Sequence, residues 1–250
     1  MLAVLFITLL VPVSSDAQRS GSTIDTGKIF EAIGVRQGST VCEVGAGDGD
    51  LSIAAARIVG SQGRIYTSEL GEERVKALQE KAGHSSLAQI TVVHGDAAKT
   101  NFPDAACDAL FMRNVYHHFA DPAAMNTSLW KALAPGGRLA IVDFAPPDKE
   151  ATRAADRDED GMHGVSAESV SREMKDAGFE PVSSELGSRR WFMVVVSKPG
   201  AGDSLLLFSE QERGNGGSRP AAGTLLAMMA APQKAKRAPS CTVRGVVLVE

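Results

Sequence analysis

Along residues 24–198, short β-rich runs alternate with helical stretches, and few architectures accommodate such an alternation. Strands separated by helices predict a parallel sheet with helices on both faces, which is an α/β doubly wound fold. The last two strands have only a short link between them, so we expect a hairpin whose final strand is antiparallel to its neighbour. The seven expected strands cover residues 41–44, 64–68, 90–94, 107–112, 138–144, 182–185 and 191–197. The five expected helices cover residues 25–33, 51–58, 72–81, 121–132 and 166–178, and a turn is expected at residues 134–137.

A glycine-rich loop follows the first expected strand, with glycines at positions 45, 47 and 49. Alternating glycines allow a tight turn and let the backbone approach a ligand without Cβ clashes, and the next helix presents free N–H groups. A nicotinamide-type fingerprint needs Gly-x-Gly-x-x-Gly, but its third glycine position holds Asp50. Glu43, just before the loop, is suited to a ligand's ammonium group rather than to a pyrophosphate. The pattern therefore favours a ligand that carries an amino acid zwitterion.

Two further acidic residues follow the second and third expected strands. Glu69 stands 20 positions after Gly49, where a carboxylate binds a ribose diol through two hydrogen bonds. Asp96 follows Gly95 at the end of the third strand and is suited to accept a hydrogen bond from an adenine amino group. Each signal alone also fits a surface residue or a simple turn. Together with the glycine loop they indicate a site for an adenosine with an amino acid attached.

Charge and cysteine content exclude several classes of partner. The net charge of −4 gives no general attraction to nucleic acid or to anionic membranes. The three cysteines are widely spaced, and no Cys-x-x-Cys or Cys/His ligand spacing is present. The sequence therefore supports neither a disulfide framework nor a zinc site, and we expect no metal.

The chain divides into three parts. Residues 1–17 are expected to be a signal peptide, since residues 1–13 are almost wholly apolar and Ser15 and Ala17 suit a cleavage after Ala17. A mis-assigned start or a loosely packed segment is the alternative, because no Lys or Arg precedes the apolar run. Residues 18–200 form the expected domain, without a membrane span once the signal is removed. Residues 201–250 are rich in Gly, Ser, Ala and Pro and are expected to be a disordered tail. A functional signal would place the protein outside the cytoplasm.

From about residue 24 to residue 198 the chain resembles the class I S-adenosylmethionine-dependent methyltransferases, and also a bacterial subgroup of them with apparent export signals. The family's first motif corresponds to residues 43–49, its ribose-binding acidic residue to Glu69 and its adenine motif to residues 95–97. Residues 108–119 and 133–139 are similar to the family's fourth-strand segment and to the turn before its fifth strand.

The resemblance implies a Rossmann-like seven-stranded sheet of order 3-2-1-4-5-7-6, with S-adenosyl-L-methionine as the cofactor. The residues that we expect to bind this cofactor are Glu43, Gly45, Ala46, Gly47, Gly49, Glu69, Leu70, Asp96, Ala97, Arg113 and Asn114.

Two adjacent histidines follow the fourth expected strand, where a parallel sheet brings its ligands. His117 or His118 is a candidate general base for a substrate hydroxyl or amine. The alternative is that one histidine packs over the cofactor and the other caps the next helix. His163 is a weaker candidate, in a loop that could cover the site as a lid.

The expected reaction is displacement of a sulfonium methyl group by a nucleophile of a small-molecule acceptor, with no nucleic-acid partner. The sequence identifies neither the acceptor atom nor the oligomeric state. Two alternatives remain open: a non-catalytic protein that binds the cofactor as a scaffold, and a nicotinamide-dependent oxidoreductase, which Asp50 and Glu43 disfavour.

Overall fold

The computed structural model describes residues 24–159 and 161–200, so the expected signal peptide and the expected tail lie outside the described residues. The strands form one seven-stranded sheet of order β3-β2-β1-β4-β5-β7-β6, as predicted. The strands are β1 (Thr40–Val44), β2 (Arg64–Glu69), β3 (Ile90–His94), β4 (Cys107–Arg113), β5 (Leu133–Phe144), β6 (Glu180–Leu186) and β7 (Trp191–Ser197). The helices are α1 (Thr26–Ala32), α2 (Asp50–Val59), α3 (Glu72–His84), α4 (Pro122–Ala132) and α5 (Ala167–Asp176), with short 3-10 turns η2 (Tyr116–His118) and η3 (Ala154–Asp156).

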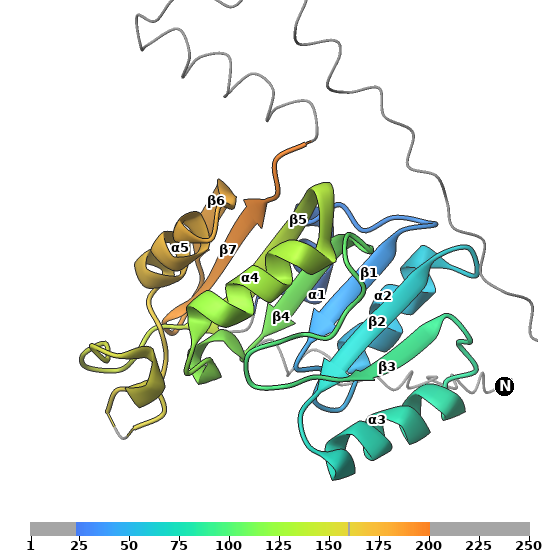
Figure 1. Ribbon diagram of the computed structural model, residues 1–250, viewed down its shortest axis with the longest axis horizontal. Helices are drawn as coiled ribbons and strands as arrows, with labels where there is room; N and C mark the ends of the chain where they lie inside the picture. Colours follow the sequence, from blue (N-terminus) through green and yellow to red (C-terminus); the bar gives the residue numbers. More distant parts are fainter. Residues whose placement is uncertain (1–23, 160, 201–250) are drawn as a thin grey trace, which may run out of the picture. The chain divides into compact units, whose positions relative to one another are not determined.

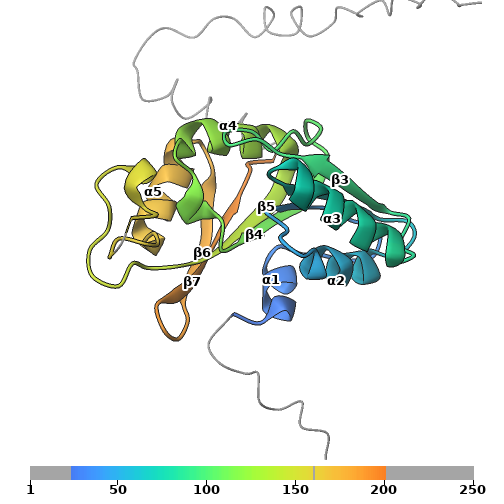
Figure 2. The same ribbon diagram turned by 90° about the horizontal axis from the view of Figure 1, so that it is seen from below.

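Five strands are parallel and the last hairpin is antiparallel. β1 lies in the centre and pairs in parallel with both β2 and β4, while β7 runs antiparallel to β5 and to β6. α1 and α2 pack on one face of the sheet, and α4 and α5 pack on the other (Figure 1). Figure 2 shows the same layers from below, with α1 and α2 on one side of the sheet and α4 on the other. The doubly wound fold predicted from the sequence is confirmed.

Polar side chains fix where three of the helices begin. The Asp25 carboxylate accepts the backbone N–H of Gly27 at 2.7 Å, and so caps α1. Asp121 caps α4 in the same way, with Pro122 in the first helical position, where its missing N–H costs nothing. The Ser166 hydroxyl caps α5. These are the starts that the sequence predicted, to within one residue.

β5 begins five residues earlier than the sequence predicted. The expected turn at residues 134–137 is wrong, because this segment is already part of the strand. The Gly136 N–H donates to the Lys198 carbonyl, and the Lys198 N–H donates to the Gly137 carbonyl. β5 therefore bulges here and still satisfies its backbone groups at the end of β7.

A disulfide joins Cys42 of β1 to Cys107 of β4, with 5.7 Å between the Cα atoms. The expectation that the cysteines form no disulfide is therefore wrong. The pairing of β4 with β5 changes register between Cys107 and Ala109, and Cys107 lies in the same core cluster as Leu110 rather than with Ala109. This change of face brings its sulfur to Cys42, which lies in that cluster too.

Within residues 24–159 and 161–200, no helix combines the length and the apolar character that crossing a bilayer requires.

We expect reduction of the Cys42–Cys107 disulfide to lower the free energy of unfolding by about 4 kcal/mol, the entropic value for a loop closed over 65 residues. Urea denaturation with and without a strong reductant measures the difference. The double variant Cys42→Ala/Cys107→Ala is the control, and its curve should not respond to reductant. Superimposable wild-type curves in the two conditions would contradict the expectation.

Candidate functional site

The parallel strands β1 to β4 end at the same edge of the sheet, and the glycine loop lies at this edge after β1. Gly45, Gly47 and Gly49 all have positive φ, of 68°, 55° and 78°. A Cβ atom at Gly45 would lie 2.5 Å from the Val115 side chain, and one at Gly49 would lie 2.5 Å from Leu78. Backbone conformation favours glycine at all three positions, and lack of space excludes a side chain at Gly45 and Gly49 as well.

The end of β2 holds the glycine loop in place. The N–H groups of Gly45 and Ala46 both donate to the Ser68 carbonyl at 3.0 Å. The next residue, Glu69, is almost buried, and its carboxylate accepts the Gly47 N–H at 2.7 Å and the Leu70 N–H at 3.0 Å. Arg74 approaches the same carboxylate at 3.5 Å. A single side chain thus connects β2 to the loop after β1.

A cavity of about 370 Å³ opens between the glycine loop and the ends of β2, β3 and β4. Its volume lies within the range of small-molecule sites. The predicted cofactor-binding residues that line it are Gly45, Glu69, Leu70, Asp96, Ala97 and Asn114. Residues that come from four separate segments of the chain therefore meet around one cavity. His118 is the candidate general base that joins them.

Five predicted cofactor-binding residues do not line this cavity: Glu43, Ala46, Gly47, Gly49 and Arg113. Gly47 and Gly49 shape the loop instead. Glu43 faces α2, where it accepts a hydrogen bond from the Ser52 hydroxyl. Burial raises the pKa of the Glu43 carboxyl to about 8, although the Ser52 hydrogen bond and the Arg113 charge oppose the shift.

Sequence reasoning missed nine residues of the cavity lining: Val44, Ser68, Arg74, Gly95, Lys99, Val115, Phe119, Ala120 and Met125. Gly95 had been noted as part of the adenine motif but not as a binding residue. Phe119 and Met125 are apolar residues after β4 and on α4, and nothing in their spacing distinguishes them from core positions. Arg74 and Lys99 carry the only Arg and Lys side chains of the lining. Their positions on surface elements gave no signal.

The candidate histidines lie in different environments. His117 is buried, and its Nδ1 is 2.8 Å from Oδ1 of the buried Asp143 at the end of β5. His118 is half exposed, and its Nδ1 is 2.8 Å from the Asp158 carboxylate. His163, in the loop after β5, reaches His117 with 3.1 Å between their Nε2 atoms. Asp121 caps α4, so neither adjacent histidine serves as that cap.

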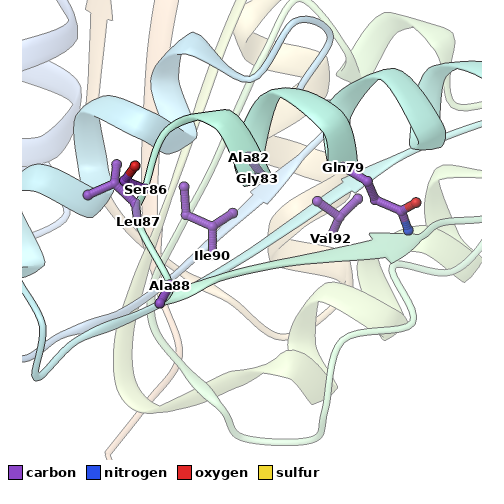
Figure 3. Close-up of a pocket in the computed structure, with 8 residues that line it drawn as sticks. All are labelled: Gln79, Ala82, Gly83, Ser86, Leu87, Ala88, Ile90 and Val92. Carbon is purple, nitrogen blue, oxygen red and sulfur yellow. The ribbon is translucent and has the colours of Figure 1, made fainter.

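A second cavity of about 460 Å³ lies between α3 and β3, at the edge of the sheet (Figure 3). Its eight lining residues include no titratable side chain, and Gln79 and Ser86 supply its polar side-chain atoms. The cavity between α3 and β3 is larger, but it offers fewer polar and titratable side chains than the cavity beside the glycine loop. The cavity beside the glycine loop is therefore the candidate site.

Comparison with protein families finds a match that includes the glycine loop. Residues 42–141, which contain the end of β1, the glycine loop and β2 to β4, match the family model described as a methyltransferase domain. A ubiquinone/menaquinone biosynthesis C-methyltransferase, UbiE, of Marinomonas sp. is 29% identical over 118 residues. This match covers 47% of each protein, so the chain spans about half the length of the curated relatives it matches.

Solved structures share the fold. A SAM-dependent methyltransferase from Aquifex aeolicus superimposes with a TM-score of 0.60 at 24% identity, over 70% of this chain and 89% of that one. A Haemonchus contortus phosphoethanolamine N-methyltransferase in complex with S-adenosyl-L-methionine superimposes with a TM-score of 0.58 at 15% identity, over 70% of this chain and 52% of that one. At these identities the likeness concerns the fold.

The raised pKa of Glu43 predicts a pH-dependent stability. The pKa of this carboxyl is near its ordinary value of 4.5 when the chain is unfolded and about 8 when it is folded, so between these values the folded state binds the extra proton. The contribution of this carboxyl to the free energy of unfolding is largest below about pH 4.5. It decreases as the pH rises to about 8, by at most about 1.4 kcal/mol per pH unit. Glu43→Gln stays neutral and should flatten this decrease.

Urea denaturation of wild type and Glu43→Gln at pH 5, 6, 7 and 8, without ligand, measures the effect. Glu72→Gln is the control, since it alters only an exposed carboxylate at the start of α3. Parallel pH profiles for wild type and Glu43→Gln would show that Glu43 does not bind the proton.

Proposed function

We propose that this chain, which carries a class I S-adenosylmethionine-dependent methyltransferase domain, is an enzyme that methylates a small-molecule acceptor. The observation that supports this most directly is the cavity at the ends of β1 to β4, whose lining includes Gly45, Glu69 and Asp96. The sequence assigned these residues to three parts of one ligand: Gly45 to the amino acid portion, Glu69 to the ribose and Asp96 to the adenine. The net charge of −4 argues against a nucleic-acid acceptor.

The described residues fit this cofactor. A carboxylate, Glu69, is presented to the cavity with its oxygens already oriented by the Gly47 and Leu70 N–H groups. A ribose diol can donate to those oxygens. At Gly45 the backbone packs directly against Val115, since a Cβ atom there would lie 2.5 Å from its side chain. The Asp96, Ala97 and Leu70 side chains offer one polar and two apolar surfaces for an adenine.

The predicted cofactor-binding residues that do not line the cavity lie in or next to the glycine loop, apart from Arg113. Ala46, Gly47 and Gly49 bring the backbone close to the ligand, and α2 begins immediately afterwards at Asp50. The N–H groups of Gly45, Ala46 and Gly47 already donate within the protein. We therefore propose that the N–H groups of the first turn of α2, which has no side-chain cap, bind the carboxylate of the amino acid portion. The Glu43 carboxyl, buried beneath the loop, then responds to the positive charge of the cofactor, and Arg113 and Asn114 border the same portion.

The cofactor, once bound, supplies an electrophilic methyl group, so the protein must orient the acceptor and exclude water. Phe119, Ala120 and Met125 give the cavity an apolar wall next to His118. We place the acceptor against this wall, because His118 is the candidate base with access to the cavity. His117 is buried behind it and acts on the acceptor only through its neighbours.

The two alternatives make different predictions about binding. A scaffold would bind the cofactor or its product without turnover, and a nicotinamide-dependent oxidoreductase would bind the dinucleotide. The test is calorimetric titration of the full chain with S-adenosylhomocysteine, with nicotinamide adenine dinucleotide as the control ligand. One-to-one binding of the first alone, followed by methyl transfer to any member of an acceptor panel, supports the proposal. Binding of the dinucleotide alone would replace the proposal with the oxidoreductase.

We expect Glu69→Ala to weaken S-adenosylhomocysteine binding by about 1–3 kcal/mol, the scale for hydrogen bonds to a charged group. The variant also loses the bond to the Gly47 N–H. Glu69→Gln keeps one acceptor oxygen and should lose less affinity than Glu69→Ala.

Titration calorimetry gives the affinities, and circular dichroism verifies that the variants are folded. Glu72→Ala is the matched control, since this glutamate is exposed at the start of α3 and does not line the cavity. An affinity of Glu69→Ala equal to that of Glu72→Ala would remove Glu69 from the site.

A further inference from the structure

We propose that His117, His118, Asp158 and His163 bind a divalent transition-metal ion at the edge of the cofactor cavity. These four residues are called the His/Asp cluster below. Each offers one ligand atom, and the four atoms lie within 4.8 Å of one another. No metal was expected from the sequence, because it has no Cys-x-x-Cys or Cys/His ligand spacing. In the fold, two ligands of the cluster are adjacent on η2, and the other two lie about forty residues further along, in the loop after β5.

The first argument is the orientation of the His117 ring. The Asp143 carboxylate is fully buried and also accepts the backbone N–H groups of His117 and Phe144, at 3.2 and 2.9 Å. Since it can only accept, the His117 Nδ1 at 2.8 Å carries the ring proton. The Nε2 lone pair therefore points towards the cluster. Metal-bound histidines are held in this way by a carboxylate on the other ring nitrogen.

The second argument is the approach of a second imidazole to that lone pair. The Nε2 atom of His163 lies 3.1 Å from the Nε2 atom of His117. Two ligand nitrogens on one tetrahedral zinc ion stand roughly 3.3 Å apart, given bonds of about 2.0 Å. A shared proton is the alternative that satisfies the same pair of nitrogens. A shared proton would not explain why the His118 and Asp158 side chains also approach the two Nε2 atoms.

The third argument is the charge and chemistry of the remaining ligands. The Asp158 Oδ1 atom lies 2.8 Å from the His118 Nδ1 atom and 3.7 Å from the His163 Nε2 atom, so it stands between both imidazoles. Three imidazoles with one carboxylate suit Zn²⁺, Fe²⁺, Co²⁺ or Ni²⁺, whereas Mg²⁺ and Ca²⁺ prefer oxygen ligands. His118, Asp158 and His163 are each about half exposed, which leaves a solvent-facing side for an exchangeable ligand.

The fourth argument is that buried contacts fix both backbone segments of the cluster. Tyr116, next to His117, donates to the Glu173 carboxylate on α5 at 3.0 Å. Arg157, next to Asp158, is buried and forms a salt bridge with the same carboxylate. Figure 1 shows the loop that carries Asp158 beside α5, in yellow. Glu173 thus ties η2 to this loop.

The His163 side of the loop is fixed as well. The Gly164 N–H donates to the Arg157 carbonyl at 3.2 Å, and the Val165 N–H donates to the Phe144 carbonyl at 3.0 Å. A Cβ at Gly164 would lie 2.6 Å from the Phe144 carbonyl oxygen. The cluster is therefore preorganised, which is the condition for tight metal binding.

The location of the cluster suggests what the metal would do, and this step rests on the proposed function. His118 belongs to both the cluster and the cavity lining. A metal ion bound there would take an oxygen atom of the acceptor as its exchangeable ligand and favour its deprotonated form, with the proton released to water on the exposed side of the cluster. The acceptor class would then be a phenol, an enol or another acidic hydroxyl compound, and the metal would take over the role considered for His118 as a base.

The test uses the full chain purified without a polyhistidine tag, stripped with a chelator and titrated with Zn²⁺ and with Co²⁺. Elemental analysis gives the stoichiometry, and the visible absorption of Co²⁺ reports its coordination. We expect one equivalent bound by wild type. His163→Gln and Asp158→Asn should each weaken binding at least tenfold; both residues are half exposed, so folding should persist. His84→Gln, at the end of α3, is the matched control and should behave as wild type.

Failure to retain Zn²⁺ or Co²⁺, or equal binding by wild type and His163→Gln, would overturn the metal site and leave a proton-sharing cluster. The proposed function is assessed separately by S-adenosylhomocysteine titration of the same samples. Metal binding without S-adenosylhomocysteine binding contradicts the proposed function alone, and the reverse result contradicts the metal site alone.

Discussion

The pairing of β1 with β2 on one side and β4 on the other is the constraint on which the rest of the site depends. Parallel pairing brings the ends of three strands to one edge, and the Ser68 carbonyl then anchors the Gly45 and Ala46 N–H groups. The Glu69 carboxylate continues this anchoring at Gly47. Since each contact joins the end of one strand to the loop after another, no single segment could form the cavity alone.

Much of this arrangement could be predicted from local chemistry. Alternating strands and helices determined the sheet, and capping residues such as Asp121 and Ser166 marked where helices begin. The glycines at 45, 47 and 49 were recognisable because a backbone with positive φ favours glycine, and at Gly45 and Gly49 there is also no space for a side chain. Glu69 and Asp96 followed from their positions after strands, a relation that the parallel sheet preserves.

What could not be predicted depends on register or on distant contacts. Period-two alternation places Cys107 on the opposite face from Leu110, and only the irregular pairing near Ala109 reverses this. The early start of β5 depends on hydrogen bonds to Lys198. The approach of His163 to His117 depends on Arg157 and Glu173, residues that read separately as ordinary surface charges.

The disulfide between β1 and β4 links the cavity beside the glycine loop to the chemistry of the compartment in which the chain folds. Cys42 immediately precedes Glu43, and Cys107 begins the strand that leads to Asn114. Disulfides form and persist where thiols are oxidised, as in the periplasm, and glutathione keeps thiols reduced in the cytosol. The two strands that border the cavity are thus covalently joined only after the cysteines are oxidised. In the same polypeptide made in a reducing compartment, β1 and β4 would be held together by their pairing alone.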